Sequence, residues 1–167
     1  VDLANRRWKG LEALARWTHP TEGYISPAVF IAVAERIGFV LQFEEWALRQ
    51  VCMQARAWLD MGFAFGRVSV NVSAQQFARR DFVDQLSAIL HESRVPGIYL
   101  ELEITESSLM DDDPSVLQRL QRIRELGVTL AVDDFGTGYS SLNYLKTFPI
   151  NKLKIDRTFV HGLPDDA

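Results

Sequence analysis

Apolar residues in this chain follow two spacings that take turns along the sequence. Alternation of apolar and polar residues predicts strands, and the segments that show it are residues 10–17, 67–73, 98–105, 128–133 and 152–156. Between them, apolar residues recur every three or four positions, as on one face of a helix. Strands and helices in regular succession predict an α/β fold with a parallel sheet.

The first helical region begins with Ser26 as N-cap and Pro27 at the first helical position. We expect Gly38 to divide it into two helices and Gly62 to end the second. Each helix should face the core with an apolar stripe: Val29, Phe30, Val33 and Ile37 in the first, and Leu48, Val51, Cys52 and Ala55 in the second.

Two further helices and a loop complete the predicted elements. One helix covers about Asp81–His91, and another starts at Asp113–Pro114 and closes at Gly127. The stripe of the second is Val116, Leu117, Leu120 and Ile123. A glycine-rich loop at 135–139 then leads to a short helix that ends before Pro149.

Every predicted strand has an apolar face and a polar face. The polar faces carry Glu12, Asn71, Glu103, Asp133 and Lys154. Parallel strands are usually apolar on both faces, so a polar face requires an explanation. For any single strand, the polar face could be explained by contact with water, or by an antiparallel sheet with one side in solvent. Five strands in succession favour one shared site instead.

Composition narrows the function classes. The chain has 167 residues, 47% hydrophobic and 24% charged, which suits one globular domain. A net charge of -4 shows no basic excess, so we expect no DNA or RNA partner. No run approaches the roughly 18 apolar residues of a membrane span. Cys52 is the sole cysteine, and we expect a core residue in a reducing, cytoplasmic setting.

The predicted cluster suits a hard divalent cation. Several carboxylates close together repel one another unless a cation offsets their charge, and oxygen ligands suit Mg²⁺, Mn²⁺ or Ca²⁺. Asp133 and Asp134 stand together at a strand end. A chain that turns there could let Asp133 bridge two ions about 4 Å apart while Asp134 binds the second. Alternatively, Asp134 only opens a turn before Gly136.

Several long motifs, in order, make the whole chain resemble the EAL domain family of bacterial cyclic di-GMP phosphodiesterases. They are "EALARW" from Glu12, "HPTEGYISPAVFIAVAERIG" from His19, "NVSAQQF" from Asn71, "LELEITES" from Leu100, "DDFGTGYSSL" from Asp133 and "KLKIDRTFV" from Lys152. The resemblance implies a modified (β/α)₈ barrel of the TIM type, of which this chain holds about five βα units. It also implies hydrolysis of cyclic di-GMP to linear pGpG with Mg²⁺ or Mn²⁺ as cofactor.

The same resemblance implies roles for individual residues. The ligands of a first metal ion are matched by Glu12, Asn71, Glu103 and Asp133. The ligands of a second are matched by Asp133 and Asp134. Lys154 matches a lysine beside the attacking water. Leu14 and Arg16 match contacts to a guanine base and a phosphate. Glu106 matches a glutamate that anchors the loop after the two aspartates. Glu101 shares the polar face with Glu103 but would lie deeper in the barrel, and we therefore interpret it as structural.

The chain departs from the family at both ends. A strand with a Tyr-Gln-Pro substrate contact is expected before residue 1, and later Glu-Gly-Val-Glu and Gln-Gly-Tyr segments have no counterpart. We therefore expect residues 1–167 to be a partial EAL domain. The intact parent should be an active enzyme, whereas the isolated chain should be inactive or weakly active.

Other functions compete with the enzyme. A cyclic di-GMP receptor without catalysis would bind the nucleotide and not turn it over, although receptors usually lose the EAL triplet or the Asp-Asp pair. A regulatory dimerisation module would not bind the nucleotide. An unrelated barrel enzyme would act on another substrate. The resemblance also implies a homodimer, with GGDEF or sensory domains in a parent that is cytoplasmic or the cytoplasmic part of a membrane-anchored protein.

Overall fold

The computed structural model describes residues 8–109, 115–136 and 147–156. Its main sheet is parallel and runs in the order β1 (Gly10–Glu12), β4 (Arg67–Val72), β5 (Leu100–Thr105), β6 (Thr129–Phe135) and β7 (Lys152–Ile155). A separate antiparallel hairpin pairs β2 (Trp17–His19) with β3 (Gly23–Ile25). The predicted α/β architecture with a parallel sheet is confirmed, and an antiparallel main sheet is excluded.

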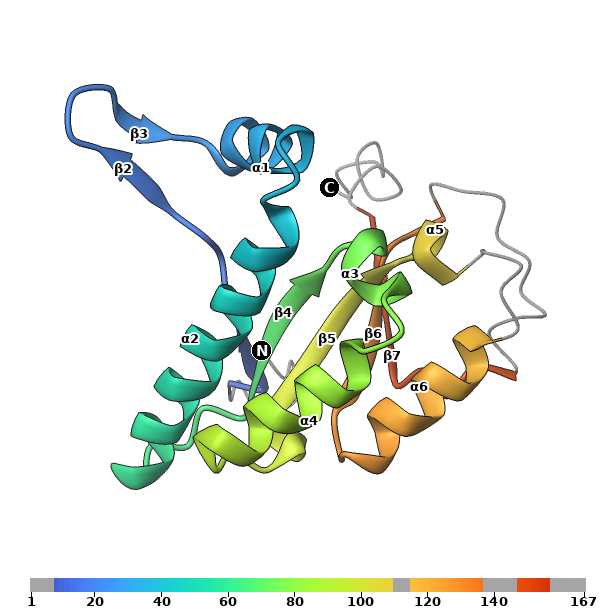
Figure 1. Cartoon of the computed structure of the whole chain (residues 1–167). Coiled ribbons are helices and arrows are strands. Elements are labelled where there is room, and N and C mark those ends of the chain that lie inside the picture. Colours follow the sequence, from blue (N-terminus) through green and yellow to red (C-terminus); the bar gives the residue numbers. More distant parts are fainter. Residues whose placement is uncertain (1–7, 110–114, 137–146, 157–167) are drawn as a thin grey trace, which may run out of the picture.

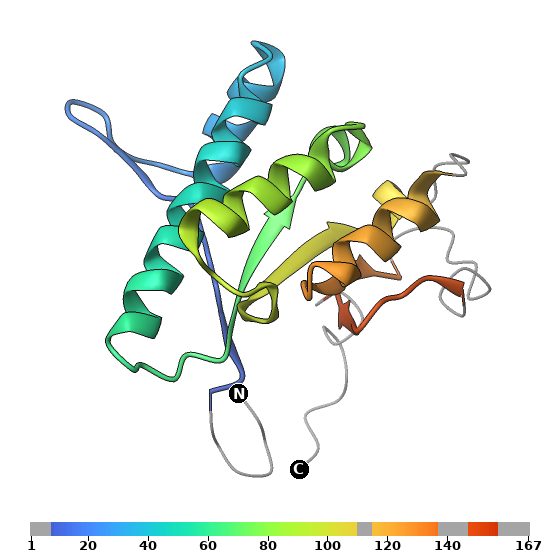
Figure 2. The same ribbon diagram turned by 60° about the horizontal axis from the view of Figure 1, so that its bottom comes forward.

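The helices are α1 (Pro27–Arg36), α2 (Val40–Asp60), α3 (Ala74–Ala78), α4 (Phe82–Ser93), α5 (Glu106–Leu109) and α6 (Ser115–Glu125), with a 3₁₀ turn at Gly97–Tyr99. Helices α2, α4 and α6 cover one face of the sheet, and the hairpin and α1 project beyond it (Figures 1 and 2). Strand residues on the helix side are buried in the core: Val68, Val70, Val72, Leu100, Leu102, Ile104, Leu130 and Val132. The opposite face therefore holds the polar residues of the alternating pattern.

The first predicted strand, residues 10–17, was too long. Strand β1 ends at Glu12, although the Ala13 amide still donates to the Ser69 carbonyl at 2.9 Å. Trp17 leaves the sheet and begins the hairpin, where its ring packs edge-to-face on Phe30 with ring centroids 6.0 Å apart. An alternating pattern cannot reveal this change, because the hairpin continues the same period of two.

The stripe predicted for α1 does not face the core. Val29, Val33 and Ile37 are 58%, 44% and 69% exposed, whereas Ala34 is buried and Phe30 is half-buried. The interpretation was wrong because this short helix packs on α2 and the hairpin through the side that carries Phe30 and Ala34, so only Phe30 of the predicted stripe is partly buried. The stripe of α2 is confirmed, with Leu48, Cys52 and Ala55 buried.

The remaining boundaries differ by a few residues. Gly38 and Gly62 lie just after α1 and α2 with φ of 72° and 69°, the left-handed conformation that favours glycine. Leu117 of α6 is 37% exposed, so its predicted stripe reduces to Val116, Leu120 and Ile123. The predicted start of that helix, most of the 135–139 loop and the helix before Pro149 lie outside the described residues.

Two short helices were not predicted, α3 and α5, and each follows the carboxyl end of a strand. Ser73 caps α3, with its hydroxyl oxygen accepting from the Gln76 amide at 3.1 Å. Within the described residues, no helix has both the length and the apolar character needed to cross a membrane.

Candidate functional site

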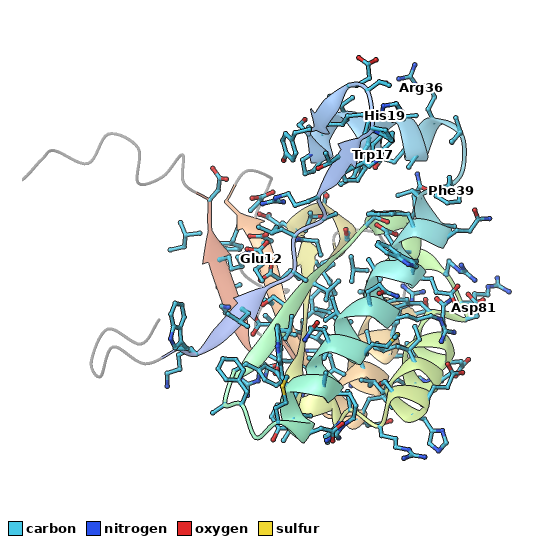
Figure 3. The ribbon with its side chains drawn as sticks, turned by 90° about the vertical axis from the view of Figure 1, so that its left-hand side faces the viewer. Glu12, Trp17, His19, Arg36, Phe39 and Asp81 are labelled. Atoms are coloured by element: carbon cyan, nitrogen blue, oxygen red, sulfur yellow. The ribbon has the colours of Figure 1, made fainter. Side chains whose placement is uncertain are left out.

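The five polar residues singled out by strand parity lie on neighbouring strands in the order Glu12, Asn71, Glu103, Asp133 and Lys154. Asn71 lies directly opposite Glu103 in the β4–β5 pairing. Figure 3 shows Glu12 on the side of the sheet away from the helices, with Asp81 on the far side. The predicted convergence on one face is therefore confirmed.

Hydrogen bonds join these side chains into two groups. Asn71 Nδ2 donates to Glu12 Oε1 at 3.2 Å. Lys154 Nζ donates to Glu103 Oε2 at 2.6 Å and to Asp133 Oδ2 at 2.9 Å. One ammonium thus holds two carboxylates from adjacent strands close together, as the like charges require.

The charges around Lys154 alter its acidity. Desolvation by itself lowers the pKa of the Lys154 ammonium. The hydrogen bonds that Lys154 donates to Glu103 and Asp133, together with their negative charges, outweigh this effect and raise the pKa above its usual value. Glu103 is only 3% exposed, so its carboxylate depends on this ammonium for compensation. Lys154 is protonated at neutral pH and acts as a fixed positive charge.

Strand β6 turns sharply at the second aspartate. Asp134 has φ of 52°, which is uncommon for a residue other than glycine, and its amide donates to Asp133 Oδ1 at 3.0 Å. The β6–β7 register is also irregular between Val132 and Phe135. Partial burial of the carboxyl group, followed by the negative charges of Asp133 and Asp156, raises the pKa of Asp134. Both aspartates therefore lie at a distorted strand end.

Glu106 lies off the polar face, at the start of α5. Its carboxylate is buried, and Oε2 accepts a hydrogen bond from the Gly136 amide at 2.9 Å. This bond joins Glu106 to the first residues after the two aspartates. The geometry fits the loop-anchoring assignment, and that role stays a prediction.

Leu14 and Arg16 lie between β1 and the hairpin and are both exposed. They line a largely apolar groove of about 470 Å³, together with Asn71 and α2 residues that include Phe43 and Trp46. Asn71 belongs both to this groove and to the polar cluster. The assignment of Leu14 and Arg16 as substrate contacts stays a prediction, and the structure places them beside the cluster.

Sequence reasoning missed two contacts next to the cluster. Glu44 of α2 accepts from the Ser73 amide at 3.2 Å and the Ser73 hydroxyl at 2.9 Å, which fixes the end of β4 just beyond Asn71. Lys152 Nζ donates to Glu101 Oε1 at 2.7 Å on the polar face itself. Parity had placed Glu101 and Lys152 on that face, but only the register shows that they meet.

The donor set suits a hard divalent ion, since it consists of carboxylate oxygens and an amide carbonyl. In the described residues, however, no three His, Cys, Asp or Glu side chains are grouped closely enough to bind one ion. The Lys154 ammonium lies where a cation would bridge Glu103 and Asp133. The chemistry of these ligands fits a divalent ion.

Known proteins share the sequence and the fold. The family profile described as EAL domain matches residues 1–167. The bifunctional diguanylate cyclase/cyclic di-GMP phosphodiesterase MucR of Pseudomonas aeruginosa is 46% identical over 159 residues, which are 95% of this chain and 23% of MucR. The cyclic di-GMP phosphodiesterase NbdA of the same organism is 43% identical over 162 residues, which are 97% of this chain and 21% of NbdA.

Among solved structures, the PaMucR phosphodiesterase in its c-di-GMP complex matches with a TM-score of 0.88 and 45% identity. The match covers 95% of this chain and 64% of that chain. The five-stranded sheet and its helices thus correspond to part of a TIM-like barrel, and the chain spans less than a quarter of the length of MucR and NbdA. This chain belongs to the EAL domain family.

Proposed function

We propose that this chain carries part of the active site of a metal-dependent phosphodiesterase that hydrolyses cyclic di-GMP to linear pGpG. The observation that carries the proposal is the placement of five polar side chains on one face of a parallel sheet, opposite the face that α2, α4 and α6 cover: Glu12, Asn71, Glu103, Asp133 and Lys154. Active sites of TIM-type barrels lie at the carboxyl ends of the strands, and Asp133 lies near such an end. The names of MucR and NbdA support the substrate.

Mg²⁺ or Mn²⁺ is the proposed cofactor. Glu12, Asn71, Glu103 and Asp133 would hold a first ion, and Asp133 and Asp134 would hold a second. Bound ions of this kind activate water and offset the negative charge that develops on phosphoryl oxygens. The left-handed conformation of Asp134 supports the second site, because a regular strand would direct its side chain to the face opposite that of Asp133.

The side chains of this protein supply positioning and charge. Lys154 would hold the attacking water and stabilise negative charge while one P–O bond forms and another breaks. Arg16 would bind a phosphate of the nucleotide and Leu14 would contact a guanine base. Glu106, through the Gly136 amide, would hold the chain after the two aspartates in place.

The direct test measures pGpG formed from cyclic di-GMP in the presence of Mn²⁺ or Mg²⁺, with the longest available form of the parent. Glu12→Ala should abolish turnover, whereas Glu125→Ala, an exposed glutamate of α6 on the helix side, should leave it unchanged. Turnover that survives Glu12→Ala, or that needs no divalent ion, would refute the proposed site.

A catalytically silent receptor for cyclic di-GMP is the second candidate. The Lys154 ammonium between Glu103 and Asp133 favours it, because this arrangement satisfies both carboxylates without a metal. Nucleotide binding without product, with or without Mn²⁺, would select the receptor. Absence of binding would favour a regulatory dimerisation module.

The parent protein is proposed to be larger and multidomain. MucR and NbdA are about four to five times longer than their matching segments. MucR is named as a bifunctional diguanylate cyclase, which supports a cyclase (GGDEF) or sensory domain beside this one. Homodimerisation stays a proposal, and analytical ultracentrifugation of the parent tests it.

A further inference from the structure

A second polar layer lies on the same face of the sheet, two residues further from the carboxyl ends of the strands. It consists of Ser69, Glu101 and Lys152. Ser69 Oγ donates to Glu101 Oε1 at 2.8 Å, and Lys152 Nζ donates to the same oxygen at 2.7 Å. Glu101 is only 4% exposed, so this carboxylate is buried as deeply as Glu103.

The two layers repeat the same pairing. Each glutamate comes from β5 and each lysine from β7, so both lysines reach across β6 to their partner. Ala131 lies between them on β6, opposite Glu103 on one side and Lys152 on the other. Thr129, two residues before Ala131 on the same face of β6, lies opposite Glu101.

Each of the two buried carboxylates is paired with its own ammonium group: Glu101 with Lys152, and Glu103 with Lys154. A buried carboxylate without a cation is strongly unfavourable, so each glutamate competes for any ammonium within reach. If Lys152 lost its charge, the Ser69 hydroxyl would be the remaining hydrogen-bond partner of Glu101 among the described residues. Lys154, two residues along the same face of the same strand, would then be attracted towards Glu101 and away from Asp133.

Other cations border this region as well. Lys9 and Arg67 line the same cavity of about 300 Å³ as Glu101, Glu103 and both lysines of β7. Arg67 Nε donates to the Ile98 carbonyl at 3.2 Å, at the amino end of β5. Lys154 is distinguished from Lys9 and Arg67 because it lies on the same strand and the same face as Lys152.

We propose that Glu101 and Lys152 are a positioning pair for Lys154. By satisfying Glu101, Lys152 leaves the Lys154 ammonium at Glu103 and Asp133, in the candidate active site. The geometry stands by itself, but the importance of Lys154 rests on the proposed phosphodiesterase function. Neither Glu101 nor Lys152 would touch the substrate.

The test follows Lys154 directly by NMR of lysine ammonium groups. The chain contains only four lysines, Lys9, Lys146, Lys152 and Lys154, so their Nζ signals can be assigned by substitution. Lys152→Met should displace the Lys154 Nζ signal. The double variant Glu101→Gln/Lys152→Met should return it to the wild-type position, because the competing charge is gone. Lys152→Arg should leave it unchanged.

Recovery in the double variant separates positioning from a structural role. A pair that only stabilises the sheet would leave the Lys154 signal in place in all variants, or displace it equally in Lys152→Met and in the double variant. Either result would overturn the proposal. Should Lys152→Met not fold, Lys152→Gln gives the same comparison, and urea denaturation reports the stability of each variant.

Turnover by the parent protein adds a second readout. Lys152→Met should lower kcat for cyclic di-GMP with little change in KM, and the double variant should recover kcat. An unchanged kcat in an active parent would overturn the positioning role. If the wild-type parent is inactive, the phosphodiesterase proposal fails while the NMR comparison still decides the charge partition.

Discussion

Lys154 compensates two carboxylates that would otherwise repel one another. Lys154→Met should therefore lower the free energy of unfolding by about 3 kcal/mol, because it leaves Glu103 buried without a counter-charge. Mn²⁺ should restore much of this loss, since a ligand that binds only the folded state stabilises it. Urea denaturation with and without Mn²⁺ measures both effects.

Lys154→Arg provides the matched control for that substitution. The guanidinium keeps the positive charge, so stability without metal should stay closer to that of the wild type. Stability of Lys154→Met equal to the wild type would show that Glu103 and Asp133 do not depend on the ammonium. If Mn²⁺ raised the free energy of unfolding equally in the wild type, Lys154→Met and Lys154→Arg, then Lys154 would not compete with the cation for its site.

Cys52 is expected to be chemically inert in the folded protein. Burial in the core raises the pKa of its thiol to about 11, so at neutral pH it carries almost no thiolate, the reactive form. Iodoacetamide should modify it slowly in the native protein and readily in urea. Mass spectrometry measures the rate of alkylation. Fast alkylation of Cys52 under native conditions would contradict this prediction.

At the scale of single residues, alternation alone placed the polar cluster correctly. The period of two is a property of the backbone, so the face of Glu103 or Asp133 follows from its strand neighbours. The contact of Glu44 with Ser73 could not be predicted, because it joins α2 to the end of β4. Nor could the meeting of Lys152 with Glu101, which depends on the lysine reaching across an intervening strand.

Helix α3 depends on Ser73, whose hydroxyl both caps the helix and donates to Glu44. Burial raises the pKa of Glu44, and the two hydrogen bonds from Ser73 partly oppose that rise. A folded-state pKa above the unfolded value means that ionising Glu44 costs stability as pH rises from about 4.5 towards neutrality. Removing the hydroxyl should enlarge that cost.

Ser73→Ala should accordingly lower the free energy of unfolding by about 1–2 kcal/mol near neutral pH. The difference from the wild type should shrink as the pH falls to about 4, where Glu44 is increasingly protonated in both proteins. Ser73→Thr keeps a hydroxyl and serves as control. A difference that does not vary with pH would leave capping of α3 as the sole role of Ser73.

Helix α4 ends on a residue with an unfavourable backbone conformation. Arg94 has φ of 55°, which strains any residue with a Cβ atom, and its contact with Arg56 is made by its backbone carbonyl. Arg94→Gly should raise the free energy of unfolding by about 1 kcal/mol, whereas Arg94→Val should lower it. Thermal and urea denaturation measure both changes. A change of the same sign and size in the free energy of unfolding of both variants would contradict this prediction.

At the scale of elements, helices and strands were predicted where one face is buried, and the errors lie where tertiary packing decides. The spacing of Val29, Val33 and Ile37 is typical of a buried face, yet α1 turns this face outward. A ten-residue helix with apolar residues on more than one side can pack either way, and its neighbours decide. Trp17 likewise leaves the sheet to pack on Phe30.

At the scale of the whole molecule, the succession of strands and helices was enough to predict a parallel α/β sheet. The order of strands was not predicted, and the structure shows that the strands of the main sheet lie side by side in the order in which they occur along the chain. Within the described residues, β1 and β7 each pair on one side only. In this described part of the chain the sheet therefore has two edges that a closed barrel would not have, and its five strands form an incomplete barrel wall.

An incomplete wall makes a specific prediction for activity. The cluster from Glu12 to Lys154 supplies charge and ligands, but catalysis also needs the substrate held rigidly and water excluded. The isolated chain of 167 residues should therefore form little or no pGpG with Mn²⁺, whereas the parent should be active. Both should lose any activity on Glu12→Ala. Equal turnover per molecule by the chain and the parent would show that these five strands form a complete active site. The groove beside Leu14 and Arg16 would then have to bind the nucleotide without the rest of the barrel.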